Sequence, residues 1–221
     1  MKKRKKKTKI FIAVDGGSAS GKTTAAEFLS SYYNINFLSS GRLYRYCALK
    51  IINNKNNYNK LFINKIIKSL KDTSLKNSKL YNKEVTKKSS EIAKVKYIRE
   101  SLKKFQLKFY KNLDGAIIEG RDIGTKIMPN ADLKLFFVCS AKEKARRRFK
   151  EFKKVNKNIS FKEVKKALIQ RDYDDKHRKI SPLIKAKNAV LVDTTKLTLK
   201  EMRLKLIKIV DKALTRKYGN I

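Results

Sequence analysis

The sequence predicts an α/β fold in which buried parallel strands alternate with helices. Five short apolar runs rich in β-forming residues recur along the chain, and segments with helical spacing of apolar residues separate them. A glycine-rich loop follows the first run and leads directly into such a helical segment. The strands are expected at residues 10–14, 35–38, 116–118, 133–138 and 189–192.

The loop after the first strand fits the phosphate-loop pattern G-x-x-x-x-G-K-[ST], and it has the strand-loop-helix context that this motif requires. Its backbone N–H groups can surround a β-phosphate, Lys22 can bridge the β- and γ-phosphates, and the Thr23 hydroxyl can bind Mg²⁺. The loop therefore predicts a nucleoside triphosphate site but does not identify the acceptor. The ATP-binding residues expected here are Gly16, Gly17, Ser18, Ala19, Ser20, Gly21, Lys22, Thr23 and Thr24.

The segments between the later strands have helical patterns of unequal clarity. Residues 53–82 are the least readable part: 61–70 have helical spacing, but 70–82 have no firm period. Residues 85–113 read as one helix. A hydroxyl followed three residues later by Glu is typical of a capping box, and each such pair predicts a helix start. These pairs are Ser140 with Glu143, Ser160 with Glu163, and Thr198 with Glu201.

Arginines and acids gather near the predicted carboxyl ends of strands, where open α/β sheets bind ligands. Because most basic residues in this chain are Lys, the Arg clusters indicate sites that use the planar guanidinium to bind phosphates or base edges. A loop ion pair is the alternative for the cluster at residues 119–125, and a solvated helix face for 146–148. The clusters lie at residues 39–45, 119–125, 146–148 and 171–178.

The composition is strongly basic, with 57 Lys and Arg against 19 Asp and Glu in 221 residues, a formal charge of +38. The first nine residues hold seven basic groups, and the remaining charge is spread evenly. This even spread favours a composition bias over a basic docking face, which is the alternative. No apolar run is long enough for a membrane span or a signal peptide, and the two cysteines, Cys47 and Cys139, read as reduced core thiols. We expect a cytoplasmic protein.

With these residues in place, the chain resembles the bacterial cytidylate kinases, a family of P-loop nucleoside monophosphate kinases, from about residue 10 to residue 214. The resemblance rests on four strings beyond the phosphate loop pattern itself. They are Asp15-Gly16 before the loop, Ser40-Gly41 with Tyr44-Arg45, Glu119-Gly120-Arg121-Asp122-Ile123-Gly124-Thr125 followed by Pro129, and Arg171-Asp172 with Asp175 and Arg178 before Ser181-Pro182-Leu183.

The resemblance implies a five-stranded parallel P-loop sheet flanked by helices, in a single kinase domain over residues 10–221 after a basic tail at 1–9. It also implies an acceptor-binding insertion, shortened here at 53–82, and a lid at 149–161. The implied reaction transfers the γ-phosphoryl group of ATP to CMP and dCMP, with Mg²⁺ accompanying ATP, and yields CDP or dCDP and ADP. We expect a monomer with no specific nucleic-acid partner and no membrane partner.

By the same resemblance, one set of residues binds the acceptor. Ser40, Ser90, Arg99 and Asp122 look like the cytosine-reading set, Arg45, Arg121 and Arg178 like the holders of the acceptor phosphate, and Arg171 with Asp175 like the pair near the ribose; Tyr44 joins this group. Lys22, Arg121, Arg171 and Arg178 are the expected catalytic residues. The chain departs from the family at Ser39, Arg42, Gly17 and Ala19, and we expect the two loop changes to be tolerated because the loop acts through its backbone.

Two alternatives remain open at the level of the sequence. A P-loop kinase could use another small acceptor, such as UMP, AMP or shikimate; Asp122 and Arg99 favour cytosine, because a carboxylate accepts from the 4-amino group and a guanidinium donates to N3 and O2. A basic P-loop protein could instead bind RNA or ribosomes and use the nucleotide as a switch. A kinase needs no general base here, because the acceptor is already an oxyanion.

Overall fold

The computed structural model describes residues 8–153 and 159–219, so most of the basic tail and the middle of the predicted lid lie outside the described part. The chain divides into two compact units. The first contains the chain up to Leu38 and from Asp114 onward, and the second is Ser39–Leu113. The predicted single-domain division, with a tail at 1–9, an insertion at 53–82 and a lid at 149–161, stays a prediction.

A five-stranded parallel sheet flanked by helices forms the centre of the first unit, as predicted, with strand order β2-β3-β1-β4-β5. In its register Asp15 lies opposite Gly120 on one side and Phe136 on the other, so three strands reach their carboxyl ends at the same edge. The strands are β1 (Phe11–Gly16), β2 (Asn36–Ser39), β3 (Ala116–Gly120), β4 (Leu133–Val138) and β5 (Val190–Asp193).

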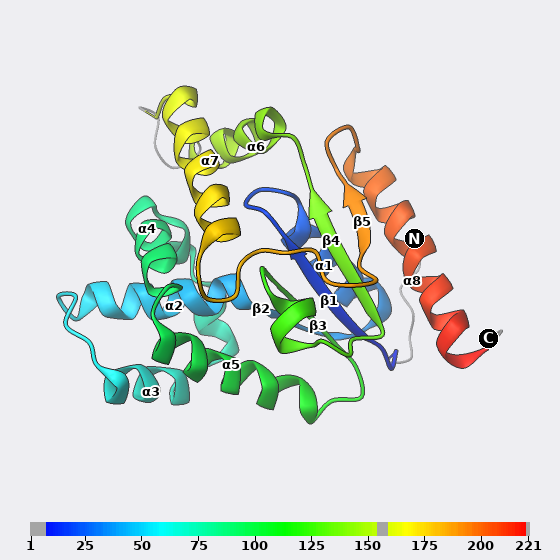
Figure 1. Ribbon diagram of the computed structural model, residues 1–221, viewed down its shortest axis with the longest axis horizontal. Helices are drawn as coiled ribbons and strands as arrows, with labels where there is room; N and C mark the ends of the chain where they lie inside the picture. Colours follow the sequence, from blue (N-terminus) through cyan, green and yellow to red (C-terminus); the bar gives the residue numbers. More distant parts are fainter. Residues whose placement is uncertain (1–7, 154–158, 220–221) are drawn as a thin grey trace. The chain divides into compact units, whose positions relative to one another are not determined.

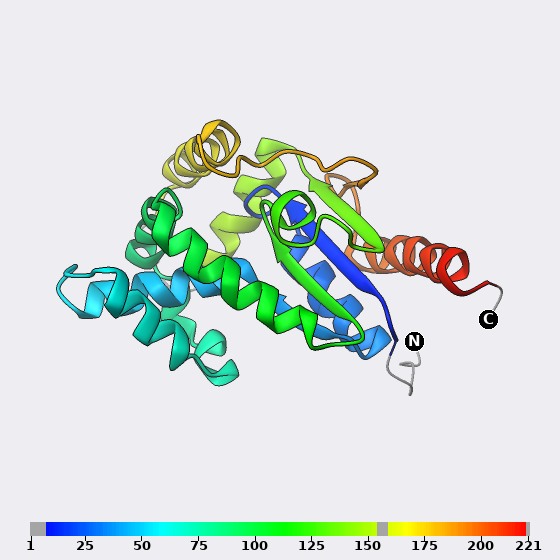
Figure 2. The ribbon, with the colours of Figure 1, turned by 60° about the horizontal axis from the view of Figure 1, so that its bottom comes forward.

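Two helices of the first unit, α1 (Lys22–Tyr33) and α8 (Leu199–Tyr218), share one apolar core with the sheet (Figures 1 and 2). The Tyr33 hydroxyl also donates to Asp211 Oδ1 at 2.9 Å. Beyond the carboxyl end of β4 the chain enters α6 (Ala141–Lys153), which packs against α7 (Phe161–His177). A five-residue π-helical turn, η3 (Ile123–Ile127), follows β3.

The predicted capping boxes are confirmed at α7 and α8, where Glu163 and Glu201 reach back to the backbone N–H groups of Ser160 and Thr198. The prediction is half wrong at α6. Ser140 Oγ accepts from the Glu143 N–H at 3.3 Å, but the Glu143 carboxylate binds Arg146 and Arg147. Two guanidinium donors on the next turn therefore take the carboxylate away from the cap.

Apart from Ser39, which ends β2, the described residues of the second unit form helices joined by turns and short irregular segments. Its helices are α2 (Ser40–Asn53), α3 (Lys60–Lys68), α4 (Lys83–Ile92) and α5 (Lys96–Lys111), with short 3-10 turns η1 (Asp72–Lys76) and η2 (Ser78–Tyr81). Asn59 and Asn82 cap α3 and α4 by accepting backbone N–H groups three residues on. The helical pattern at 61–70 is thus confirmed as α3.

The single helix predicted over residues 85–113 is wrong, because the chain breaks between α4 and α5. Val95 takes an extended conformation, with φ −87° and ψ 116°, and α5 starts after it. The break leaves the Ala93 carbonyl outside a regular helix, and Arg99 Nη1 donates to that oxygen at 3.2 Å. The buried Arg99 guanidinium therefore stabilises the end of α4, which the helical spacing of the apolar residues does not reveal.

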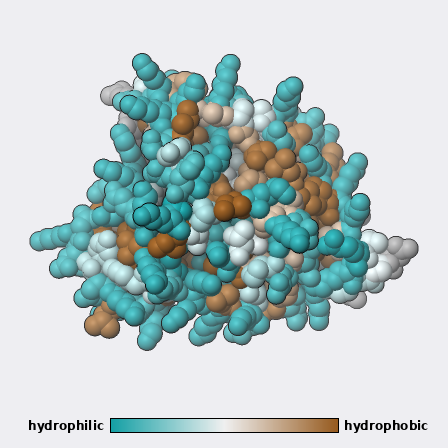
Figure 3. Space-filling view, in the orientation of Figure 1, coloured by the Kyte–Doolittle hydropathy of each residue, from teal (hydrophilic) through white to brown (hydrophobic). Residues whose placement is uncertain are grey.

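The described part of the chain contains no helix that is long and apolar enough to cross a membrane. Hydrophilic side chains dominate the face in Figure 3, and its largest apolar patch lies over β5, whose Val190 and Leu191 are exposed. Cys47 is a buried free thiol, as predicted, whereas Cys139 is a free thiol that is only partly buried. The core-thiol prediction thus holds for Cys47 alone.

Candidate active site

The phosphate loop joins β1 to α1 and is fixed by close backbone packing. A Cβ on Gly16 would lie 2.5 Å from the Phe137 carbonyl oxygen, so the first position of the loop needs glycine. Gly21 has φ +86° and forms the N-cap of α1. Ala19 has φ +54°, a left-handed conformation in which a side chain is strained. The loop is therefore held in shape by β4 and by its own glycines.

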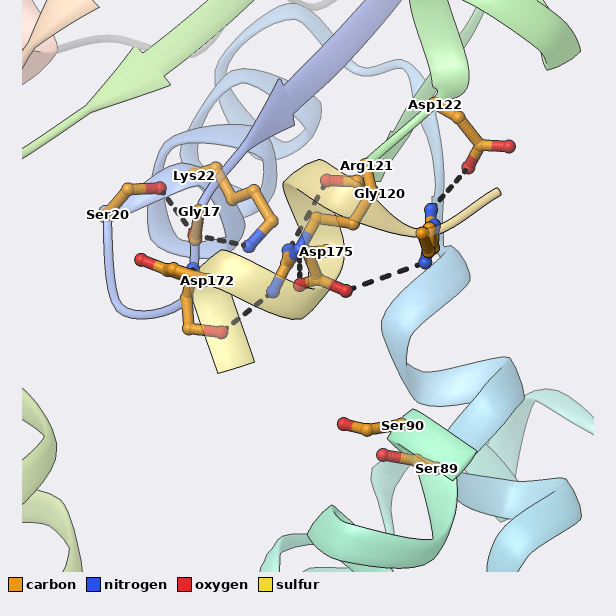
Figure 4. A network of polar contacts seen from close by, with 12 residues as sticks. Gly17, Ser20, Lys22, Ser89, Ser90, Gly120, Arg121, Asp122, Asp172 and Asp175 are labelled. Atoms are coloured by element: carbon orange, nitrogen blue, oxygen red, sulfur yellow. Dashed lines mark hydrogen bonds and ion pairs between the residues drawn. The ribbon is translucent and has the colours of Figure 1, made fainter. Parts of the chain in front are cut away.

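The Lys22 ammonium group is buried inside this loop (Figure 4). It donates to the Gly17 carbonyl oxygen at 3.1 Å, and its Nζ lies 3.9 Å from Glu119 Oε2. Burial, and next the positive charge of Arg121, lower the pKa of Lys22 to about 7. A phosphate group beside this ammonium would reverse that electrostatic balance and favour its charged form.

Two buried acids support the same end of the sheet; both stand in strings that carry the family resemblance, but the sequence assigned a role to neither. Asp15 accepts the backbone N–H groups of Ile123 at 2.8 Å and Gly124 at 2.7 Å, which ties β1 to η3. Burial raises the pKa of Asp15 to about 6, although these two hydrogen bonds oppose the shift. Glu119 ends β3 beside Lys22. In the sequence, each acid stands at the end of a predicted strand and directly before a motif, and this position was the signal that could have identified both.

Two arginines and two carboxylates form a network between β3 and α7 (Figure 4). Arg121 Nε donates to Asp175 Oδ2 at 2.7 Å, and Arg121 Nη2 donates to the phosphate-loop hydroxyl of Ser18 at 2.9 Å. Arg178 Nη1 lies 3.5 Å from Asp175 Oδ1, and Arg178 Nη2 lies 3.9 Å from Asp122 Oδ1. Burial alone would raise the pKa of Asp175, but Arg121 and Arg171 hold it below its usual value.

Arg171 is the arginine of this group with a buried donor that no described protein group accepts. Its buried Nε has no hydrogen-bond partner within the described residues. Burial, and next the charge of Arg121, lower the pKa of Arg171 to about 10. Arg171 and Asp175 are four residues apart and lie on one face of α7, and Arg178 follows directly after the last residue of this helix, His177.

The remaining predicted acceptor residues lie in the second unit, where their side chains are held by backbone oxygens and by each other. Arg45 Nη1 donates to the Leu80 carbonyl oxygen at 2.8 Å and to Thr86 Oγ1 at 2.7 Å. The Arg99 guanidinium lies over the Tyr44 ring, 5.7 Å from its centroid. Ser40, the first residue of α2, is buried, and Ser90 Oγ donates to the Thr86 carbonyl oxygen at 3.3 Å.

The residues that depart from the family pattern have local partners. Ser39 caps α2 by accepting the Arg42 N–H at 3.1 Å, and Arg42 Nε donates to the Tyr81 hydroxyl at 2.8 Å.

The arginines of residues 146–148 form ion pairs with carboxylates on their own helix, Arg146 and Arg147 with Glu143 and Arg148 with Glu151. Arg147 also donates to Thr194.

Only the two ends of the predicted lid are described, and residues 154–158 lie outside the described part. The end of α6 and the start of α7 meet where Phe149 and Phe161 pack edge to face, with ring centroids 5.7 Å apart. No group of three His, Cys, Asp or Glu side chains among the described residues could hold a metal ion by itself.

Comparisons with known proteins identify the family of this chain. A family model described as cytidylate kinase matches residues 12–212. The chain is 36% identical over 206 residues to the cytidylate kinase of Fusobacterium nucleatum, covering 87% of this chain and 93% of that protein. It is 35% identical over 212 residues to the cytidylate kinase of Alkaliphilus oremlandii, covering 91% of this chain and 97% of that protein.

A solved structure shares the fold. An uncharacterized protein from Eubacterium ventriosum matches with a TM-score of 0.57 at 15% identity, over 93% of this chain and 99% of that one. Identity this low supports the fold and says nothing about the substrate.

Proposed function

Since the chain belongs to the cytidylate kinase family and is therefore a nucleoside monophosphate kinase that phosphorylates CMP, we propose which of its residues carry out the transfer from ATP. The observation that carries the proposal is the buried network of Lys22, Arg121, Asp175 and Arg178, with the unpartnered Nε of Arg171 beside it. It concentrates positive charge at the carboxyl end of the sheet, where the phosphate loop begins.

Charge is the main physical obstacle to this reaction. ATP and CMP together carry about six negative charges at neutral pH, and the transferring group spreads further charge over its oxygens. Lys22 binds the donor phosphates within the loop of residues 16–24, while Arg121, Arg171 and Arg178 offer planar donors to the transferring group and the acceptor phosphate. Catalysis then consists of positioning and electrostatic stabilisation.

The residues fit a magnesium ion that arrives with the nucleotide. The partly buried Thr23 at the start of α1 can supply a hydroxyl ligand, and the phosphate oxygens of the nucleotide can supply others. A bound Mg²⁺ would neutralise phosphate charge. In the transfer, an oxygen of the CMP phosphate forms a bond to the γ-phosphorus as the bond to the β-γ bridging oxygen breaks, which leaves ADP as the product.

We assign residues to each of the three parts of the acceptor nucleotide. The base is read by Ser40, Ser90, Arg99 and Asp122, the phosphate is held by Arg45, Arg121 and Arg178, and the ribose by Arg171 and Asp175; Tyr44 supports Arg99 through the ring contact. In the second unit, the guanidinium groups of Arg45 and Arg99 are buried and fixed by carbonyl oxygens. Fixed donors of this kind lose little entropy when they bind a ligand.

A coupled assay of ADP release tests this assignment, with ATP and Mg²⁺ against CMP, dCMP, UMP, AMP and GMP. We expect turnover with CMP and dCMP, little with the others, and none after chelation of Mg²⁺. The folded Lys22→Ala protein is the control for contaminating kinases and should lose several powers of ten in turnover. A folded wild-type protein that leaves CMP unphosphorylated would contradict the proposal.

Two further expectations concern partners. We propose that the protein is a monomer and that its basic surface binds no specific nucleic acid, because its charge is spread along the whole sequence. Light scattering during size-exclusion chromatography measures the first. Retention on an RNA column at physiological salt would contradict the second.

A further inference from the structure

One buried carboxylate of the first unit, Asp172, takes no part in the proposed transfer and yet touches the phosphate loop directly. It is only 7% exposed, its Oδ1 accepts the Ser18 N–H at 2.8 Å, and its Oδ2 is hydrogen-bonded to the Lys144 ammonium. A Cβ on Gly17 would lie 3.0 Å from Oδ2, so the carboxylate rests against the loop where glycine leaves space.

Ser18 is consequently held to α7 by two routes. Its N–H donates to Asp172, and its hydroxyl accepts from Arg121, which is itself bound to Asp175. Asp172 and Asp175 are three residues apart on α7, so both routes end on the same face of one helix. The same helix carries Arg171, and Arg178 follows directly after its last residue. A fixed link between Ser18 and this face fixes the distance between the loop and the arginines.

The link brings a negative charge next to a loop that receives phosphates. A carboxylate buried there without compensation would oppose the binding of any anion, because like charges repel strongly where water is excluded. Lys144, on α6, supplies the compensating charge through its ion pair with Asp172. The pair thus presents the loop with a hydrogen-bond acceptor but little net charge.

We propose that Asp172 is a positioning residue that fixes the phosphate loop to α7, and that Lys144 neutralises it so that the donor nucleotide can bind. The inference rests on the proposed function in one respect, the binding of ATP phosphates by the loop. It assigns to Asp172 and Lys144 a role in donor binding and alignment, distinct from the acceptor residues.

The test is a double-mutant cycle measured as KM for ATP, kcat, and the dissociation constant of CMP. Lys144→Met removes the ion-pair partner of Asp172 and leaves its charge facing only Arg121 and Arg171, so KM for ATP should rise about tenfold. Asp172→Asn keeps an oxygen for the Ser18 N–H and should stay within about threefold of wild type. In the Asp172→Asn background, Lys144→Met should have little further effect, because the charge that it uncovers is gone.

Asp172→Ala removes the acceptor as well and should lower kcat and raise KM for ATP together, each about tenfold, while CMP binding is unchanged. Lys142→Met on α6 and Asp174→Asn on α7 are matched controls and should behave as wild type. Circular dichroism establishes that each variant is folded; if Asp172→Ala is not, the cycle with the two conservative variants decides alone.

Two outcomes would overturn the inference: an unchanged KM for ATP in Lys144→Met, or an equal effect of Lys144→Met with and without Asp172→Asn. The Lys22→Ala protein separates this failure from that of the proposed function. If Lys22→Ala keeps full turnover, the loop does not bind the donor phosphates. If Lys22→Ala is inactive while the cycle shows no coupling, only the role of Asp172 and Lys144 is wrong.

Discussion

Lys22 shows how a single residue can serve the reaction at the expense of stability. Its folded-state pKa, about 7, lies below the ordinary value of 10.5, so folding must bury a charge at acidic pH. Between these two values the unfolded chain binds more protons, and the Lys22 contribution to the free energy of unfolding becomes less unfavourable as pH rises. Lys22→Met should therefore raise Tm by several degrees at about pH 6 and by less at about pH 9.

Thermal unfolding of both proteins at the two pH values measures this difference. The same variant should be inactive, so stability and turnover move in opposite directions. A lower Tm for Lys22→Met at both pH values would mean that Lys22 is charged in the fold and stabilised by Glu119, because such a contribution is fully present below the ordinary pKa of 10.5.

Asp122 is the residue whose replacement tests recognition of the base. It is buried, and the structure places its carboxylate 3.9 Å from Arg178 Nη2. Asp122→Asn keeps the shape but adds a donor that can bind O4 of uracil, whereas the charge that favours the 4-amino group of cytosine is lost. CMP should lose about 2 kcal/mol of transition-state binding.

The measured quantity is kcat/KM for CMP divided by kcat/KM for UMP, which should fall at least about tenfold. Equal losses with both substrates would instead assign Asp122 to the positioning of Arg178. An unchanged ratio with unchanged rates would remove Asp122 from the site.

The residues of the candidate site differ in how far the sequence could predict them. Lys22, Arg121 and Arg178 stand in local strings whose spacing is distinctive, and the structure places them in one network. The tie between Ser18 and Asp172 spans 154 positions, so no local pattern reports it. The partners of Asp15, Glu119 and Asp172 exist only after the sheet and α7 have formed, and their roles could not be predicted from spacing.

At the scale of an element, the phosphate loop combines glycines with different functions. Ala19→Gly removes the strain of a left-handed alanine but increases the conformational entropy of the unfolded chain. It should therefore raise the free energy of unfolding by less than about 1 kcal/mol. Gly21→Ala, at φ +86°, should destabilise by about 1 kcal/mol. Gly16→Ala should cost more than about 2 kcal/mol, because its Cβ would collide with the Phe137 backbone.

Urea unfolding of the three variants gives this order directly. A Gly16→Ala protein as stable as the wild type would show that β4 can move away from the loop.

The contacts of Arg45 with η2 and α4 offer a prediction for the second unit. Arg45 Nη1 donates to Thr86 Oγ1 and to the Leu80 carbonyl oxygen. Thr86→Val keeps the side-chain shape but removes one of these two acceptors. If Arg45 holds the acceptor phosphate, a loosened guanidinium should raise KM for CMP about tenfold and leave KM for ATP unchanged. Thr73→Val, at an exposed position of η1, is the matched control.

Steady-state kinetics with each substrate varied in turn separates the two constants. A parallel rise in both would indicate damage to the fold, and no rise in KM for CMP would exclude Thr86 from the positioning of Arg45.

Elements themselves were predictable where the pattern is local. Strands with continuous apolar runs and helices with reciprocal caps, such as α7 and α8, follow from neighbouring residues alone. The break between α4 and α5 does not, because apolar residues keep helical spacing through it and the contact that stabilises it comes from the Arg99 side chain. The half-formed cap of α6 likewise depends on competition among side chains for Glu143.

At the scale of the whole molecule, the presence of a parallel sheet was predictable because parallel strands covered on both faces appear in the sequence as near-continuous, although short, apolar runs. The strand order β2-β3-β1-β4-β5 was not, since pairing over large sequence distances leaves no local pattern. The net charge of +38 follows directly from the composition, and nothing in the structure explains it. Its consequences can nevertheless be measured.

A charge of +38 in 221 residues should make salt act on stability and on substrate binding in opposite directions. Between about 20 mM and about 500 mM NaCl the screening length falls from roughly 20 Å to roughly 4 Å, which weakens repulsion among the many exposed lysines. Tm should therefore rise by several degrees. Over the same range KM for ATP and for CMP should rise, because both substrates are anions that the positive field attracts.

Deleting residues 2–7, which lie outside the described part, removes six of the positive charges. Comparing this variant with the wild type shows how much of the salt effect on Tm and on the Michaelis constants comes from the tail. The deletion should leave both Michaelis constants within about twofold of wild type, because charged runs at chain ends are usually solvated and dispensable. A larger rise would mean that the tail contributes to substrate attraction. A Tm that falls with salt in both proteins would show that attractive pairs such as Arg121 with Asp175 outweigh the general repulsion.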